Sequence, residues 1–177
     1  MKTNFSAMKY INQILHGAGA ISFIVAYLSS DSESLRVLHV YCGYAFGAIF
    51  IIRILLGLFP NSSHSLQAIW RRANLGKTLY IDIKKLEIKR LMHWQRWYGA
   101  IMGFIIISMY ALVPPMILAG IGAYEEFGGR WARKMMENSH EALGELYLMM
   151  VIIHLTLIAM RHLLLKYQNH TAALSIE

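Results

Sequence analysis

The chain contains a single cysteine, Cys42, among its 177 residues. One cysteine excludes an internal disulfide, a cysteine-rich zinc site and an iron–sulfur cluster held by this chain alone. The sequence also lacks a C-x-x-C-H motif, which excludes a covalently attached c-type haem. Charged residues are scarce too, at 15% of the chain. Any metal or redox chemistry must therefore use ligands other than a set of cysteines.

What the chain has in abundance is apolar surface. Hydrophobic residues make up 56% of the sequence, and the mean hydropathy is +0.42. A soluble domain of this size cannot bury so much apolar surface, so hydrocarbon is the expected solvent. The net charge of +7 could suggest nucleic acid, but in a membrane protein it is typical of basic cytoplasmic loops. We therefore expect a lipid bilayer as partner and no nucleic acid.

Four apolar stretches are long enough to cross a bilayer. They predict helices over residues 11–28, 35–59, 97–121 and 141–165. The first could be mistaken for a signal peptide, but its length and its flanking Tyr10 and Tyr27 favour a retained helix. The sequence thus predicts an all-α integral membrane protein: one domain over residues 1–177, built as a four-transmembrane-helix bundle.

The loop at residues 60–92 sets the predicted orientation. It carries seven cations against two acids, Asp82 and Glu87, whereas the other loops have no such excess. The cations are Arg71, Arg72, Lys77, Lys84, Lys85, Lys89 and Arg90. By the positive-inside rule we expect this loop and both termini of an inner-membrane protein to be cytoplasmic. Residues 65–91 fit either an amphipathic helix on the membrane surface or a solvated basic loop.

Four histidines lie in or at the edge of the predicted helices: His16, His39, His140 and His154. Ionisable side chains are costly within a membrane, so each is a candidate functional residue. His140 and His154 are fourteen residues apart, close to four helical turns, which puts them on one face about 21 Å apart. One metal ion cannot bridge that distance, whereas two stacked cofactors can.

The predicted depths of these histidines give the pairing. His39 and His140 fall near the periplasmic face, whereas His16 and His154 fall in the cytoplasmic half. Each pair would hold one iron between facing helices, a usual place for cofactors in a bundle. Two axial histidines leave haem iron without an open position, which suits electron transfer rather than oxygen binding. The pattern therefore predicts two bis-histidine haems.

Three further residues complete the candidate cofactor site. Gly43 and Gly144 lie one turn after His39 and His140, where a missing side chain leaves room for a flat macrocycle. The alternative is that Gly43 belongs to an ordinary G-x-x-x-G packing contact. Arg53 lies toward the cytoplasmic border and is a candidate for haem propionates or a quinone headgroup.

Two more histidines, His93 and His162, lie near the same border as Arg53. They could bind propionates or quinone through charge-assisted hydrogen bonds, or they could simply reach interfacial water. His162 could also replace His154 as a ligand.

Several short segments resemble the bacterial cytochrome b561 family, which includes the membrane cytochrome b subunits of some hydrogenases. They are ILH at 14–16, LHVYCG at 38–43, IRILLG at 52–57, and HEALG at 140–144 followed by IH at 153–154. The resemblance implies two haems b, with His16, His39, His140 and His154 as iron ligands. It also implies electron exchange between quinone and a redox partner such as a cytochrome c or a hydrogenase-type subunit.

Two other functions are weighed against electron transfer. A self-contained oxidoreductase could oxidise a small periplasmic anion such as superoxide and reduce quinone, but the outer loops carry no positive excess to attract it. A histidine-based proton or metal transporter is the third reading; the fourteen-residue spacing and the lack of midplane carboxylates argue against it. The sequence leaves open the oligomeric state, the quinone type and the direction of electron flow.

Overall fold

The computed structural model describes residues 2–58 and 94–174, and within these ranges the protein is all-helical. The helices are α1 (Lys2–Leu28), α2 (Arg36–Gly57), α6 (Trp94–Tyr124) and α7 (Gly129–Leu174), with a 3₁₀ turn, η1 (Glu33–Leu35), before α2. All four long helices are long and apolar enough to cross a membrane. The predicted all-helical, four-span fold is thus confirmed. The basic loop at 60–92 and His93 lie outside the described residues, and the orientation of the termini stays a prediction.

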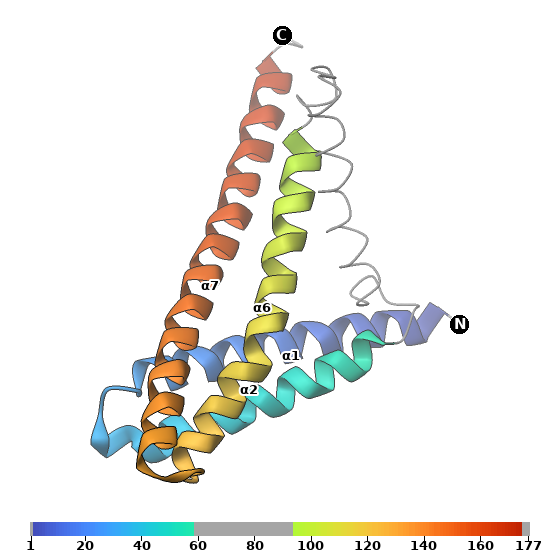
Figure 1. Ribbon diagram of the computed structural model, residues 1–177. Coiled ribbons are helices and arrows are strands. Elements are labelled where there is room, and N and C mark those ends of the chain that lie inside the picture. The colour runs from blue at the N-terminus through green and yellow to red at the C-terminus, as the bar shows by residue number, and fades with distance from the viewer. Residues whose placement is uncertain (1, 59–93, 175–177) are drawn as a thin grey trace, which may run out of the picture.

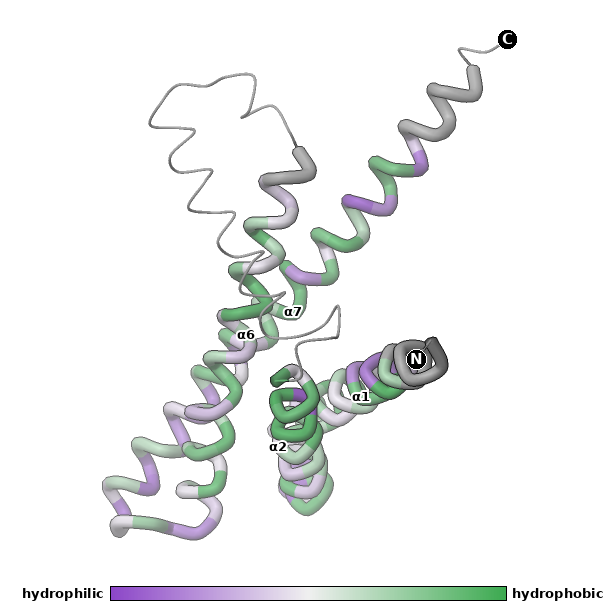
Figure 2. The backbone as a smooth tube through the Cα atoms, turned by 90° about the vertical axis from the view of Figure 1, so that its right-hand side faces the viewer, coloured by the Kyte–Doolittle hydropathy of each residue, from purple (hydrophilic) through white to green (hydrophobic). Residues whose placement is uncertain are grey.

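The four helices form two hairpins, α1 with α2 and α6 with α7, that cross each other (Figure 1). The C-terminal half of α7 rises away from α1 and α2, and Figure 2 shows the same divergence from the side. Lipid tails are as apolar as leucine, so apolar composition alone does not dictate how two such hairpins pack. The sequence pattern therefore predicts the spans but not this crossing.

Apolar side chains cover the outside of the helices. Ile14, Leu118 and Leu163 are each about two-thirds exposed, at 69%, 68% and 66%. Hydrophobic residues recur along all four long helices in Figure 2. A soluble monomer rarely presents so much contiguous apolar surface, whereas a membrane protein does so wherever it faces lipid.

The buried core is small and lies where the hairpins cross. All four long helices contribute to it. Its members are Phe23 of α1, Phe46 of α2, Val113 and Met116 of α6, and Tyr147 of α7. Pro114 and Pro115 of α6 are exposed, whereas the flanking Val113 and Met116 are buried. Val113 and Met116 therefore mark the face of α6 that points into the core.

Helix α7 is much longer than its predicted span. It begins at Gly129, twelve residues before the predicted start, and its 46 residues extend for about 69 Å, roughly twice the hydrocarbon thickness. The charged residues before His140 resembled a loop in the sequence. Instead, Arg133 and Glu137 form a pair at i and i+4, with Nε and Oε1 2.8 Å apart, which supports a helix. His140 therefore lies well inside α7 rather than at its start.

Candidate functional site

His39 lies in the first turns of α2, and its ring is held by the end of α1. Its Nδ1 lies 2.8 Å from the carbonyl oxygen of Ala26. Ala26 belongs to the last turn of α1, where its carbonyl oxygen also accepts from the backbone N–H of Ser29 at 3.3 Å. Because a carbonyl only accepts, His39 Nδ1 carries the proton and donates it. The lone pair of Nε2 is then available to bind a metal.

His140 is held in the same way by α6. Its Nδ1 donates to the carbonyl oxygen of Met116 at 2.8 Å, which again leaves the Nε2 lone pair available. One turn further along α6, Gly120 lies directly against the ring: a Cβ there would be 2.8 Å from His140 Cε1. Met116 and Gly120 thus seat the imidazole on the α6 backbone. The sequence analysis missed both residues, although a glycine on α6 near the level of His140 was a usable signal.

The structure brings His39 and His140 together from different hairpins. Their ring centroids are 5.8 Å apart, with ring planes at 89°, and both side chains are half-buried. An imidazole nitrogen binds a first-row metal at about 2 Å, so two rings on opposite sides of one iron have centroids roughly 6 Å apart. Perpendicular rings are compatible with this, because each ring can rotate about its own metal–nitrogen bond. The separation of the two rings is therefore compatible with His39 and His140 holding one haem between them.

His16 and His154, the other two predicted ligands, have different surroundings. His16 is exposed, and Arg53 of α2 donates from Nη1 to His16 Nδ1 at 2.8 Å. A guanidinium has no acceptor, so His16 Nδ1 accepts and the proton of the neutral ring is on Nε2. This is the opposite tautomer to that of His39 and His140. Iron ligation through His16 Nε2 and this contact with Arg53 are therefore alternatives.

His154 is half-buried on α7, and its Nδ1 is shielded from solvent without a hydrogen-bond partner in the described part of the chain. A shielded polar atom without a partner is costly and calls for an explanation. A bound group that contacts the ring would provide one. The C-terminal half of α7, which carries His154, extends away from α1 and α2 (Figure 1).

The side chains available as metal ligands limit which metal group the protein can bind. Among residues 2–58 and 94–174, no three histidine, cysteine, aspartate or glutamate side chains gather as a metal site. Pairs of histidines do suit haem, because the porphyrin supplies the remaining four ligands and the protein adds only the axial ones. A Cβ added at Gly43 or Gly144 would meet no other atom within 4 Å, so there is space beside both, whereas one at Gly47 would touch Ile117 at 3.4 Å. Gly47 is thus a packing glycine and Gly43 is not. These observations fit haem at the predicted residues.

Of the two border histidines, only His162 falls in the described part of the chain, where its side chain is exposed. The Arg161 guanidinium beside it lies 5.2 Å from the ring centroid of Tyr98. The two interpretations of His162, a binding residue or an interfacial one, stay open.

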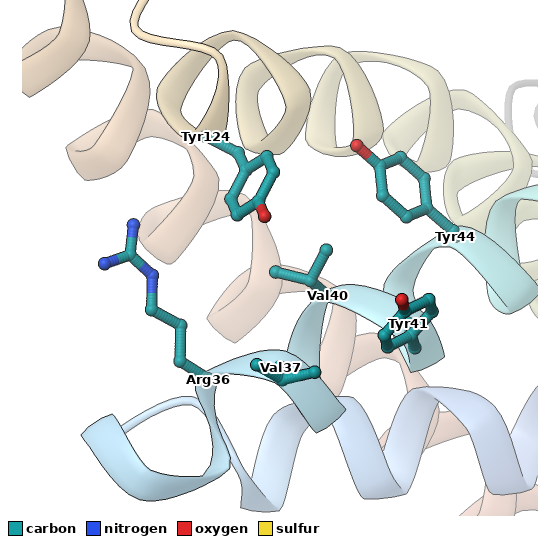
Figure 3. Close-up of a pocket in the computed structure, with 6 residues that line it drawn as sticks. All are labelled: Arg36, Val37, Val40, Tyr41, Tyr44 and Tyr124. Atoms are coloured by element: carbon teal, nitrogen blue, oxygen red, sulfur yellow. The ribbon is translucent and has the colours of Figure 1, made fainter.

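A cavity of about 630 Å³ lies beside the start of α2, between α2 and the end of α6. Its polar lining groups are Arg36, Tyr41, Tyr44 and Tyr124, and Val37 and Val40 complete the wall. Figure 3 shows Arg36 and Tyr124 on one side of Val40, with Tyr41 and Tyr44 on the other. The Arg36 guanidinium lies 6.0 Å from the ring centroid of Tyr124. The cavity straddles the level of His39 on the same helix.

Comparison with known proteins gives one match. A family model described as prokaryotic cytochrome b561 matches residues 8–170, whereas no curated protein and no solved structure matches the chain. The family implies haem b and haem-based electron transfer across a membrane, and the four apolar helices agree with a multi-pass bacterial membrane protein. A match over nearly the whole chain, together with these helices, shows that the protein belongs to the prokaryotic cytochrome b561 family.

Proposed function

We propose that this protein carries electrons across the bacterial inner membrane through two bis-histidine haems b. The observation that carries the proposal is the pair of His39 and His140, with ring centroids 5.8 Å apart. Each ring donates its Nδ1 proton to a backbone carbonyl of another helix. Such a bond fixes the tautomer and orientation of a ligating histidine and raises its basicity.

The second haem would be held by His16 and His154, on the other side of the core. The fourteen-residue spacing of His140 and His154 supports it, as does the shielded Nδ1 of His154, which has no hydrogen-bond partner among residues 2–58 and 94–174. For His16 to ligate through Nε2, its proton must move to Nδ1 and Arg53 must turn away. The freed guanidinium would then be available for a propionate, with which it can form a charge-assisted pair.

The haem and the polypeptide would have different roles in electron transfer. Haem would supply a one-electron couple when bound, and a histidine pair holding each haem would suit electron transfer rather than oxygen binding. The chain would hold the four imidazoles at two depths. Backbone carbonyls orient the outer pair, His39 and His140. Apolar side chains surround the space between the two depths. His39 and His140 keep their Nδ1 protons throughout, since each proton is already shared with a carbonyl.

Electrons would be exchanged with quinone and with a redox partner, a cytochrome c or a hydrogenase-type subunit. The phenols and the guanidinium lining the cavity beside α2 are hydrogen-bond donors suited to the carbonyl oxygens of a quinone. This cavity is therefore a candidate for the quinone headgroup, at the level of the outer pair.

The proposal is tested by counting haem. We expect the purified protein to contain two low-spin haems b per chain in a reduced-minus-oxidised spectrum with a pyridine haemochrome assay. His140→Ala and His154→Ala should each lose about one haem, and the double variant should lose both. His162→Ala, eight residues after His154 on the same helix, is the matched control and should keep two. A wild-type protein without haem would refute the proposal, and loss of a haem in the control instead of His154→Ala would move the inner ligand to His162.

A further inference from the structure

Three aromatic residues of the core repeat the spacing of the predicted iron ligands. Phe23 is seven residues after His16 on α1, and Phe46 is seven residues after His39 on α2. Tyr147 of α7 is seven residues after His140 and seven before His154, and so lies midway between them. Seven residues are nearly two helical turns, so each aromatic residue shares a helix face with its histidine, about 10 Å along the axis.

These three rings form one buried cluster. The ring centroid of Tyr147 lies 4.7 Å from that of Phe23 and 5.6 Å from that of Phe46, and the two phenylalanine rings are 5.7 Å apart. Each side chain is only 7–8% exposed. The rings come from three helices of two hairpins, and the inner face of α6 closes the cluster through Val113 and Met116.

Met116 connects this cluster to the outer histidine pair. Its side chain packs in the cluster while its backbone carbonyl accepts the proton of His140 Nδ1. A change in the packing of the rings is therefore transmitted over one residue to the orientation of a predicted ligand.

We propose that Phe23, Phe46 and Tyr147 form an aromatic partition between the two haems, packing against the inward side of both and setting their separation. This inference rests on the proposed two-haem function. The partition keeps lipid and water out of the space between the two histidine levels. It also supplies continuous van der Waals contact along the line that an electron must follow from one haem to the other. The spacing of seven residues places the three rings on the same helix faces as the four histidines, and Tyr147 lies midway between two of them.

The test is whether one substitution in the partition changes both haems. In Phe46→Leu and Phe23→Leu, we expect two haems to be retained while the EPR g-values and the reduction potentials of both shift together, because the apolar surroundings of both irons change. Tyr147→Phe keeps the ring and should leave both signals as in wild type. Phe104→Leu makes the same replacement on the exposed face of α6, where Phe104 is 65% exposed, and should shift neither.

The outcomes separate this inference from the function on which it rests. Fewer than two haems in wild type would refute both. Two haems in wild type, with leucine variants that lower stability but shift neither haem, would refute the partition alone, as would a shift confined to one haem. If a leucine variant fails to assemble, Tyr147→Phe and Tyr147→Leu decide the matter: a partition requires the wild-type signals in the first and two shifted haems in the second.

Discussion

The two predicted ligand pairs, His39 with His140 (the outer pair) and His16 with His154 (the inner pair), differ in what orients their rings. In the outer pair, His39 and His140 both donate to backbone carbonyls and face each other at 5.8 Å. In the inner pair, His16 accepts from the Arg53 side chain, and the shielded Nδ1 of His154 has no partner within the described part of the chain. A helix backbone is rigid, whereas an arginine side chain has many rotamers, so the outer site is preorganised and the inner site depends on what binds there. The two sites should therefore respond differently to substitution.

The largest difference is expected at Gly120, which touches only the outer pair. In Gly120→Ala the new Cβ would lie 2.8 Å from His140 Cε1 and push the ring off the Met116 carbonyl. We expect the outer haem content to fall several-fold while the inner haem stays, measured by haem per chain and by EPR. Gly47→Ala, whose Cβ makes an ordinary 3.4 Å contact with Ile117, is the matched control. Equal loss of both haems would show that Gly120 supports the fold and not one site.

A substitution at Gly43 tests whether haem lies beside α2. A Cβ at Gly43 meets no other atom within 4 Å in the described structure, and alanine favours a helix more than glycine does, so Gly43→Ala should not lower thermal stability. Any lowered affinity for haem then reports contact with the cofactor itself. We expect the outer haem to dissociate more readily, as measured by transfer to a haem scavenger, with the inner haem unaffected. Unchanged retention of both haems would place the macrocycle away from Gly43.

Arg53 should act on the inner site alone. Removing a cation from beside an iron favours the more positively charged oxidised state, so Arg53→Leu should lower the inner reduction potential. The outer potential should stay as in wild type, and Arg53→Lys, which keeps the charge, should give a smaller shift. A redox titration followed by EPR resolves the two haems. An equal shift in both would argue against a position of Arg53 beside His16.

The features that the sequence can predict are those that depend on a single helix. Apolar length predicts the four spans, and the spacing of His140 and His154 predicts two cofactor levels, because both follow from the rise of a single helix. The pairing of His39 with His140 also follows from predicted depth, and the two rings do lie together.

What the sequence did not reveal depends on contacts between helices. The carbonyls of Ala26 and Met116 that orient the outer rings are backbone atoms, present at every residue, so no residue type marks them. The crossing of the hairpins also has no sequence signal, because an apolar helix face can pack equally well against lipid or against another apolar helix. Arg53 was assigned to propionates or quinone from its charge and depth, whereas its hydrogen bond to His16 depends on how α1 and α2 face each other.

The smallest predicted effect lies at the end of α1, where Ser29 and His39 share an acceptor. Ser29 is 2% exposed, and its hydroxyl lies 2.7 Å from the carbonyl oxygen of Val25 and 3.1 Å from that of Ala26. Ser29→Ala removes the hydroxyl but keeps the Ser29 backbone N–H, which also donates to the Ala26 carbonyl at 3.3 Å, so this carbonyl loses one of its competing donors and accepts slightly more strongly from His39 Nδ1. A stronger bond at Nδ1 makes the ring a more basic ligand, and a more basic ligand stabilises oxidised iron. We expect a small downward shift of the outer potential only, with a stability loss of about 1 kcal/mol.

Ser30→Ala is the matched control for this change. It removes an equivalent bond, from the Ser30 hydroxyl to the carbonyl oxygen of Tyr27 at 2.8 Å, that does not involve the acceptor of His39. Its outer potential should equal that of wild type in the same redox titration. If both serine variants shift the outer haem equally, the cause is a general loosening of the end of α1. If Ser29→Ala alone shifts the outer reduction potential, the Ala26 carbonyl changes that potential through the His39 ring. This is the behaviour expected of a histidine oriented by a backbone carbonyl.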